Sequence, residues 1–199
     1  MTASDQTASP ITAEVGIAAL LETFRSRAEP LGVTVGRADD SGAAAAFMAR
    51  FATDLAMLEI LVAQELAERA PALRAALDAT DLRCHAPGDP AATRDAPFGV
   101  SLARLAVAET GSVLLAEPTL ADRAIGMLVA THLIVVATDQ LVPSLDEAAP
   151  VLDTLARQPG GGYATLVTGP SRTADIERVL TVGVQGPAKI AVLFVDALQ

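Results

Sequence analysis

The apolar run HLIVVAT at residues 132–138 narrows the choice of folds more than any other stretch of the sequence. It is rich in β-branched residues, a composition typical of a strand buried inside a sheet. The run KIAVLFVD at 189–196 has a similar character. Such strands occur mainly in parallel sheets whose two faces are both covered. The two runs therefore predict the interior of an α/β domain.

Helical and extended patterns alternate along most of the chain. The segment 65–80 favours helix, although Pro71 argues against one unbroken helix there. This alternation predicts a mixed, mainly parallel sheet covered by helices. We expect helices at 14–29, 42–54, 120–130 and 144–157, strands at 33–38, 57–63, 132–138, 163–168, 179–186 and 189–196, and two strands joined by a turn within 104–117.

Two helix starts carry capping residues. Asp39, Asp40 and Ser41 can cap the helix expected from residue 42. Ser144 and Glu147 have the spacing of a capping box, in which the serine oxygen accepts from the amide of residue 147 and the glutamate reaches back. Both positions therefore support the predicted boundaries.

The length of 199 residues fits one domain with a full-sized core. We expect a flexible polar arm at 1–13, followed by a single domain at 14–199. The N-terminal residues have neither the basic nor the apolar region of a signal peptide. The longest nearly apolar stretch, 125–137, is shorter than the roughly 20 residues that span a bilayer. These features predict a soluble cytoplasmic protein with no membrane insertion.

Charge and composition exclude several classes of function. A net charge of −10 with no tryptophan and one tyrosine argues against binding nucleic acid. The single cysteine, Cys84, can build neither an internal disulfide nor a cysteine-ligated metal cluster. His85 and His132 lack partners at ligand spacing, and His132 reads as a hydrogen-bonded histidine of the core or a loop. We therefore predict no metal and no cofactor.

Glu109 is the candidate catalytic residue. Alternation along its strand places it on the same face as Leu105 and Val107, at the end of an apolar face. A carboxylate there tends to have a raised pKa unless something pairs with it, which suits acid–base or nucleophilic chemistry. The structural alternative is that Glu109 accepts backbone amides and fixes the hairpin. Gly111 supplies a turn conformation that other residues avoid.

The stretch TGPSRTADIE at 168–177 is the candidate binding loop. An apolar strand ends at Gly169-Pro170, and a helical turn is expected near 171–173. Free amides at a helix start, together with Arg172, can hold a carboxylate or phosphate. In the structural alternative, Ser171 or Thr173 caps the turn and Arg172 pairs with Asp175 or Glu177.

The stretch GVQGP at 183–187 closes the next expected strand. Its glycines, Gly183 and Gly186, allow close approach of the backbone or a tight turn. Open α/β sheets place ligands at the carboxyl ends of their strands, where the 168–177 loop is expected to lie. We therefore predict that this loop and the turn at Glu109 converge on a pocket that accepts negative charge.

Read together, AETGSVLL at 108–115, TGPSRTADIE and GVQGP resemble the LUD-domain family, and within it the C-type lactate utilization proteins. The resemblance covers roughly residues 98–196. By position, Glu109, Thr110 and Gly111 match one motif, and Gly169 through Glu177 match the second. Gly183, Gly186 and Pro187 match the last motif, in which members usually carry histidine at the position of Gln185. Because glutamine cannot shuttle protons, this departure matters for any role of that position in catalysis.

The resemblance implies a fold and two alternative functions. The fold is the one shared by ribose-5-phosphate isomerase and the coenzyme A transferases. The first function is a non-redox component of a system that oxidises L-lactate to pyruvate, with iron–sulfur subunits as partners and a small carboxylate or phosphate as ligand. The alternative is a stand-alone enzyme that acts on an acyl-coenzyme A or a sugar phosphate through Glu109. Implied ligand-binding residues are Thr110, Gly111, Gly169, Pro170, Ser171, Arg172, Thr173, Asp175, Glu177 and Gly186.

Overall fold

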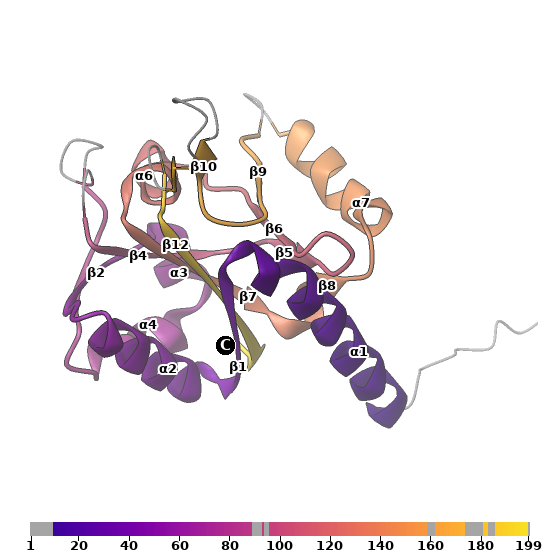
Figure 1. Ribbon diagram of the computed structural model, residues 1–199, viewed down its shortest axis with the longest axis horizontal. Helices are drawn as coiled ribbons and strands as arrows, with labels where there is room; N and C mark the ends of the chain where they lie inside the picture. The colour runs from indigo at the N-terminus through magenta and orange to yellow at the C-terminus, as the bar shows by residue number, and fades with distance from the viewer. Residues whose placement is uncertain are drawn as a thin grey trace, which may run out of the picture.

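The computed structural model describes residues 10–88, 93, 96–158, 162–173, 181–182 and 186–198. Its largest element is a six-stranded sheet in the order β1-β12-β7-β4-β2-β3, and every neighbouring pair in it is parallel (Figure 1). The α/β class predicted from the sequence is confirmed. The strands are β1 (Val33–Asp40), β2 (Glu59–Val62), β3 (Arg83–His85), β4 (Phe98–Leu102), β7 (Thr131–Ala137) and β12 (Lys189–Ala197).

Strands β7 and β12 form the middle of this sheet. They correspond to the two apolar runs, and nearly all their residues are buried. In their register His132 lies opposite Ile190, and His132 also pairs with Gly99 of β4. The last strand along the chain therefore lies between β1 and β7, and its start lies beside the start of β7.

Helices cover one face of the large sheet, as the sequence predicts. They are α2 (Ser41–Asp54), α3 (Gln64–Arg69) and α4 (Pro71–Asp78). Asp40 caps α2 by accepting the Ala43 N–H at 2.8 Å. Pro71 begins α4, so the predicted break in the 65–80 helix is real. These helices bury a continuous apolar cluster against the odd-numbered positions of β7, such as Leu133 and Val135.

The other face carries a second sheet that the sequence analysis did not predict. It has the order β8-β5-β6-β9, and β5 joins β6 through the predicted turn (Figure 1). Helix α1 lies beside it, with Phe24 meeting Phe194 of β12 edge to face at 5.0 Å. The remaining elements of this side are α1 (Pro10–Ala28), η1 (Glu29–Leu31), β5 (Leu105–Val107), β6 (Ser112–Leu115), η2 (Thr138–Gln140), β8 (Leu141–Val142), α7 (Leu145–Ala156) and β9 (Thr165–Val167).

Strands β5 and β6 of the small sheet are buried on both faces because their residues alternate between two clusters. Ala106 and Ala108 face the large sheet, whereas Leu105 and Val107 face α7. The predicted capping box starts α7, with the Ser144 N–H donating to Glu147 Oε2 at 3.1 Å. The molecule therefore stacks helices, a parallel sheet, a small sheet with α1, and α7.

Two local expectations differ from the structure. Helix α1 begins at Pro10, so part of the arm expected at 1–13 is helical, and residues 1–9 lie outside the described residues. The helical turn expected near 171–173 is instead β10 (Arg172–Thr173), which pairs antiparallel with β11 (Thr181–Val182). The proline and the polar residues suggested a helix start, but the pairing of these two short strands decides the backbone.

Helix α6 (Leu120–Leu128) packs across β4 at Gly99 and carries residues toward the start of β7. Thr119 caps it by accepting the Asp122 N–H at 3.0 Å. A Cβ atom at Gly99 would lie only 2.4 Å from Ile125 Cγ2 and 2.9 Å from Val129 Cγ1. Gly99 therefore sets how closely α6 approaches the sheet. Within the described residues, no helix combines the length and apolar character needed to cross a membrane.

We expect Gly99→Ala to lower the free energy of unfolding by about 1–3 kcal/mol, because the new methyl group overpacks the contact between β4 and α6. Urea denaturation checks this. The matched control is Gly16→Ala in α1, where a Cβ meets nothing within 4 Å and a gain in helix propensity is expected. Equal effects of the two substitutions would contradict the packing role.

Candidate functional site

Two of the sequence motifs meet directly. The Ser171 N–H donates to the Pro187 carbonyl at 3.1 Å, which ties the 168–177 loop to the entrance of β12. Gly186 has a φ of 96°, and a Cβ there would approach Ser171 Cβ to 3.3 Å. Glycine is favoured at this position because the backbone is left-handed and because a side chain would crowd Ser171. The sequence placed Ser171 and Gly186 in one site, and the structure places them in contact distance.

The third motif lies at the same end of the small sheet. Strand β6 runs antiparallel to β9, and the hydroxyls of Ser112 and Thr168 are 2.8 Å apart. Gly111 and Gly169, which are next to Ser112 and Thr168 in the sequence, both pack against the segment 28–31. A Cβ at Gly111 would lie 2.9 Å from the Ala28 nitrogen, and one at Gly169 would lie 3.3 Å from Leu31 Cβ. The two turns are therefore neighbours; Gly111 is needed for its left-handed backbone and close contact, and Gly169 makes a tight one.

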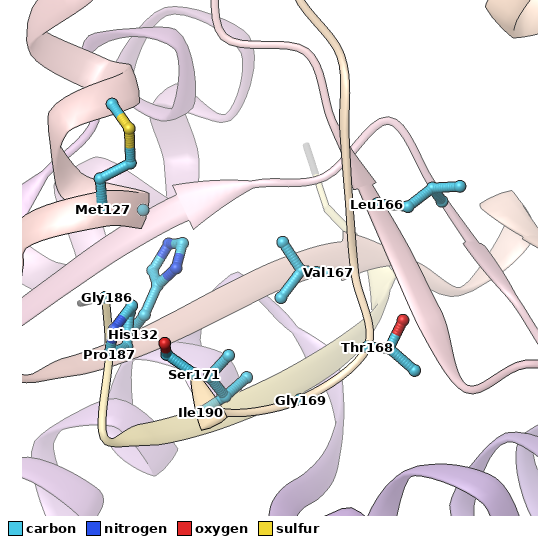
Figure 2. A pocket seen from close by; sticks show the side chains of 11 residues that line it. Met127, His132, Leu166, Val167, Thr168, Gly169, Ser171, Gly186, Pro187 and Ile190 are labelled. Atoms are coloured by element: carbon cyan, nitrogen blue, oxygen red, sulfur yellow. The ribbon is translucent and has the colours of Figure 1, made fainter. Parts of the chain in front are cut away.

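A pocket of about 380 Å³ lies between the small sheet, α6 and the starts of β7 and β12. Figure 2 shows the His132 imidazole and Val167 on opposite sides of this space, with Ser171 and Ile190 beside it. Its walls are largely apolar, and the hydroxyl of Ser171 and the ring of His132 supply polar groups. The lining residues are Gly126, Met127, His132, Leu166, Val167, Thr168, Gly169, Ser171, Gly186, Pro187 and Ile190.

Glu109 does not belong to this lining. Its side chain is exposed, and Oε1 accepts the N–H of Leu145 at 2.7 Å, at the first residue of α7. That contact matches the structural alternative of an amide acceptor, although the amide comes from α7 rather than from its own turn. Beside it, the buried Thr110 Oγ1 has no hydrogen-bond partner within the described part of the chain. A catalytic role for Glu109 stays a prediction.

The remaining predicted site residues are only partly placed. Gly169 and Ser171 line the pocket, whereas Pro170 lies between them and outside the lining. For Arg172 and Thr173 the structure gives the backbone of β10. Asp175 and Glu177 lie outside the described residues. The binding role assigned to this stretch therefore rests on its glycine and serine.

His132 is a titratable pocket residue that the sequence analysis did not select as a site residue. Its side chain is 1 % exposed, and Nε2 has no hydrogen-bond partner among the described residues. This differs from the expectation of a hydrogen-bonded core histidine. Burial lowers the pKa of the imidazole to about 4, so the ring is neutral at physiological pH. The signal in the sequence was a histidine inside a β-branched run, yet the run alone cannot show that a cavity opens beside it.

A buried carboxyl group lies close to His132. Glu117 is 3 % exposed, and its Oε1 accepts from the Ser101 hydroxyl at 2.8 Å. Burial is the main cause that raises its pKa to about 7, and nearby Asp122 and Glu65 act in the same direction. A Cβ at Gly126 would lie 3.6 Å from His132 Cε1 and 4.0 Å from Glu117 Oε2. A side chain at position 126 would therefore contact both titratable groups.

A second hollow of about 290 Å³ lies at the carboxyl ends of β4, β7 and β12. Parallel α/β sheets commonly bind ligands at that edge. Here, however, Arg69 and Arg104 both contact the carboxylate of Glu65, and Gln140 donates to Asp139. The charged groups largely compensate one another, and no described residue of the three sequence motifs lines this hollow. The motif-lined pocket is therefore the better candidate site.

Fold and site together define an α/β domain in which a small sheet holds a pocket against the amino ends of two central parallel strands. The family model described as the LUD domain matches residues 91–195, slightly more than half of the chain. The chain therefore belongs to the LUD domain family. The matched region contains the elements from β4 to β12, except the end of β12, and all the described residues that line the pocket.

Curated relatives and a solved structure agree with this assignment. The chain is 33 % identical over 103 residues to lactate utilization protein C of Macrococcus caseolyticus, and 35 % over 106 residues to that of Geobacillus kaustophilus. These matches cover 51–52 % of this chain and only 44–45 % of the relatives. A crystal structure of a DUF162 family protein from Deinococcus radiodurans aligns with a TM-score of 0.65 at 22 % identity, over 90 % of this chain and 98 % of that one. This last likeness concerns the fold.

We expect Glu109→Ala to lower the free energy of unfolding by about 0.5–2 kcal/mol, because the Leu145 amide at the start of α7 loses its acceptor. Glu109→Gln keeps an acceptor oxygen and is expected to cost less. Urea denaturation of both variants checks the ranking. Equal stability of the alanine variant and the wild type would contradict the capping role.

His132 and Glu117 give stability opposite dependences on pH. The imidazole pKa falls from 6.5 to about 4 on folding, so its contribution is complete above 6.5 and is lost as the pH falls toward 4. The pKa of Glu117 rises from 4.5 to about 7, so its contribution is complete below 4.5 and is lost as the pH rises through 7.

We therefore expect Glu117→Gln, which keeps an acceptor for Ser101, to gain stability relative to the wild type between pH 5 and pH 8, by about 1–3 kcal/mol. Urea denaturation across this range provides the measurement. The control is the exposed Glu22→Gln, whose curve should stay parallel to that of the wild type. A parallel curve for Glu117→Gln as well would show that the carboxyl group ionises normally.

Proposed function

We propose that this chain is a non-redox component of a lactate utilization system and that its pocket holds a small organic acid. The similarity of about 103–107 residues to relatives named lactate utilization protein C carries this proposal. Those relatives are more than twice as long as the matched region. The role of this chain in such a system is therefore a proposal and does not follow from the names of the relatives.

The ligand site would lie where Ser171 meets Gly186 and Pro187. Those residues come from two separate motifs, and a hydrogen bond of 3.1 Å between Ser171 and Pro187 holds them together. The cavity of about 380 Å³ beside them has the size of a small-molecule site. A hydroxyl group and a buried imidazole among apolar walls provide the few polar contacts that orient a small ligand. This arrangement supports binding of a small carboxylate.

Electron transfer would belong to partner proteins. Iron–sulfur clusters are commonly held by four cysteine thiolates, and this sequence contains only Cys84. That thiol is half-buried, and burial raises its pKa, which makes it a poor ligand and nucleophile. Oxidation of lactate in such a system would therefore need iron–sulfur subunits that work together with this chain.

The rim of the pocket offers a surface for such a partner. Met127 of α6 and Leu166 of β9 line the pocket, yet their side chains are 43 % and 44 % exposed. Exposed apolar side chains that gather around a cavity mark contact or ligand sites more often than isolated ones do. A partner that covers this rim would bury both side chains and exclude water from the ligand.

We expect the affinity-tagged chain to copurify with iron–sulfur proteins from its own host grown on L-lactate. Visible absorption and electron paramagnetic resonance of the eluate identify the clusters. The double variant Met127→Glu, Leu166→Glu should lose these partners, because it places charge on the rim. The matched control is Leu58→Glu, an apolar residue that is 50 % exposed and lies before β2.

Purification without iron–sulfur proteins during growth on lactate would reject the assembly. Retention of partners by the rim variant, together with their loss from the Leu58→Glu variant, would place the contact elsewhere. Circular dichroism of each variant verifies that the fold is kept before the partners are compared.

A further inference from the structure

Among the polar side chains that line the pocket, His132 is buried and keeps an unused hydrogen-bonding atom. Its ring is 1 % exposed, and Nε2 lacks a partner within the described residues. By contrast, Thr168 shares its hydroxyl with Ser112 at 2.8 Å. A buried nitrogen without a hydrogen-bond partner lowers the stability of the fold. In native proteins such atoms usually bind a water molecule or a ligand.

The main chain fixes where this ring lies. His132 sits in β7 between Gly99 of β4 and Ile190 of β12, so neighbouring strands hold its backbone on both sides. Opposite the ring, Gly126 of α6 presents backbone only, and a Cβ there would stand 3.6 Å from His132 Cε1. An alanine at 126 would fit at ordinary contact distance but would occupy the space beside the imidazole.

The charge state of the pocket limits what can bind. Every described side chain in its lining is apolar, a hydroxyl or the neutral ring of His132. A neutral imidazole can donate or accept one hydrogen bond at Nε2. A doubly charged phosphate would lose hydration here, and the described lining residues offer no cation to replace it. A hydroxyl or carbonyl oxygen would lose little hydration and would gain the unused hydrogen bond.

Depth distinguishes the two polar positions of the pocket. Ser171 is partly exposed, whereas His132 is buried. Apolar side chains, among them Val167 and Ile190, line the same pocket. A ligand with a hydrated carboxylate at one end and an oxygen substituent on a short carbon chain at the other would satisfy both positions.

We propose that Nε2 of His132 binds the hydroxyl or carbonyl oxygen of a short-chain hydroxy or oxo acid, and that the pocket selects such singly charged acids over phosphate esters. This inference rests on the proposed function in so far as the pocket must hold a small organic acid. It adds the residue that recognises the ligand and the feature by which the ligand is recognised.

The test measures binding at pH 7 by isothermal titration calorimetry for L-lactate, pyruvate, propionate and glycerol 3-phosphate. Propionate has the same carbon chain as lactate but lacks the second oxygen. We expect the wild type to bind lactate or pyruvate about 5- to 10-fold more tightly than propionate, and glycerol 3-phosphate most weakly. His132→Leu should abolish the preference for the oxygenated acid, whereas His132→Gln should retain part of it.

Two further variants locate the binding. Ser171→Phe fills part of the pocket and should weaken all the acids, whereas Gln140→Ala in the second hollow should change none of them. Gly126→Ala should lower lactate affinity at least threefold without lowering the melting temperature, because alanine favours the helix while its methyl group narrows the space beside His132. This variant also carries the test if His132→Leu does not fold.

The outcomes separate the two proposals. If the wild type binds none of the acids, the ligand site of the proposed function fails and this inference fails with it. If lactate binds and Ser171→Phe abolishes binding, but His132→Leu keeps the ratio of lactate to propionate affinity, the ligand site stands and the role of His132 is refuted. Tighter binding of glycerol 3-phosphate than of the acids overturns the selectivity, and unchanged lactate affinity in Gly126→Ala overturns the placement beside His132.

Discussion

The parallel pairing of β7 with β12 is the constraint on which the rest of the molecule depends. Both strands are buried on their two faces, so nearly every residue in them must be apolar. Their register also brings the start of β12 beside His132. Gly186 and Pro187, which precede β12, therefore lie close to the first residues of β7. A slip of one residue would turn His132 toward the helical layer and would close the pocket to its ring.

The pocket exists because the small sheet covers the large one incompletely. Strands β5 and β6 bury the carboxyl-terminal part of β7, whereas β9 and α6 stand over its beginning. Gly126 keeps α6 from filling the gap, and Gly111 lets the β5–β6 turn lie against the end of α1. The chain carries a net charge of −10, yet the described lining of the pocket is uncharged. Selection among anions in such a place would come from hydration and hydrogen bonding more than from charge.

Much of the fold could be predicted because local patterns fix local structure. The apolar runs became β7 and β12, the capping residues Asp40 and Ser144 begin helices where expected, and Pro71 separates two helices. The predictions were weaker where short segments carry little periodic signal. The loop after Gly169 has the polar residues of a helix start, but β10 forms there because β11 is available as a partner. The second sheet was missed because its strands are short, and which strands pair is decided by packing against β7.

By itself, the sequence determined the α/β class, the main helices, several of the strands, and two of the motifs that meet at the pocket, since periodicity, capping residues and glycine positions act over a few residues. Only the tertiary structure decided which chemical groups face a common space. It brought Ser171 against Gly186, directed Glu109 to the start of α7, and left the buried Nε2 of His132 beside the pocket without a partner among the described residues. The physical reason is that contacts between distant segments depend on strand register and helix placement. Those are set by burial of the whole core rather than by any single stretch of residues.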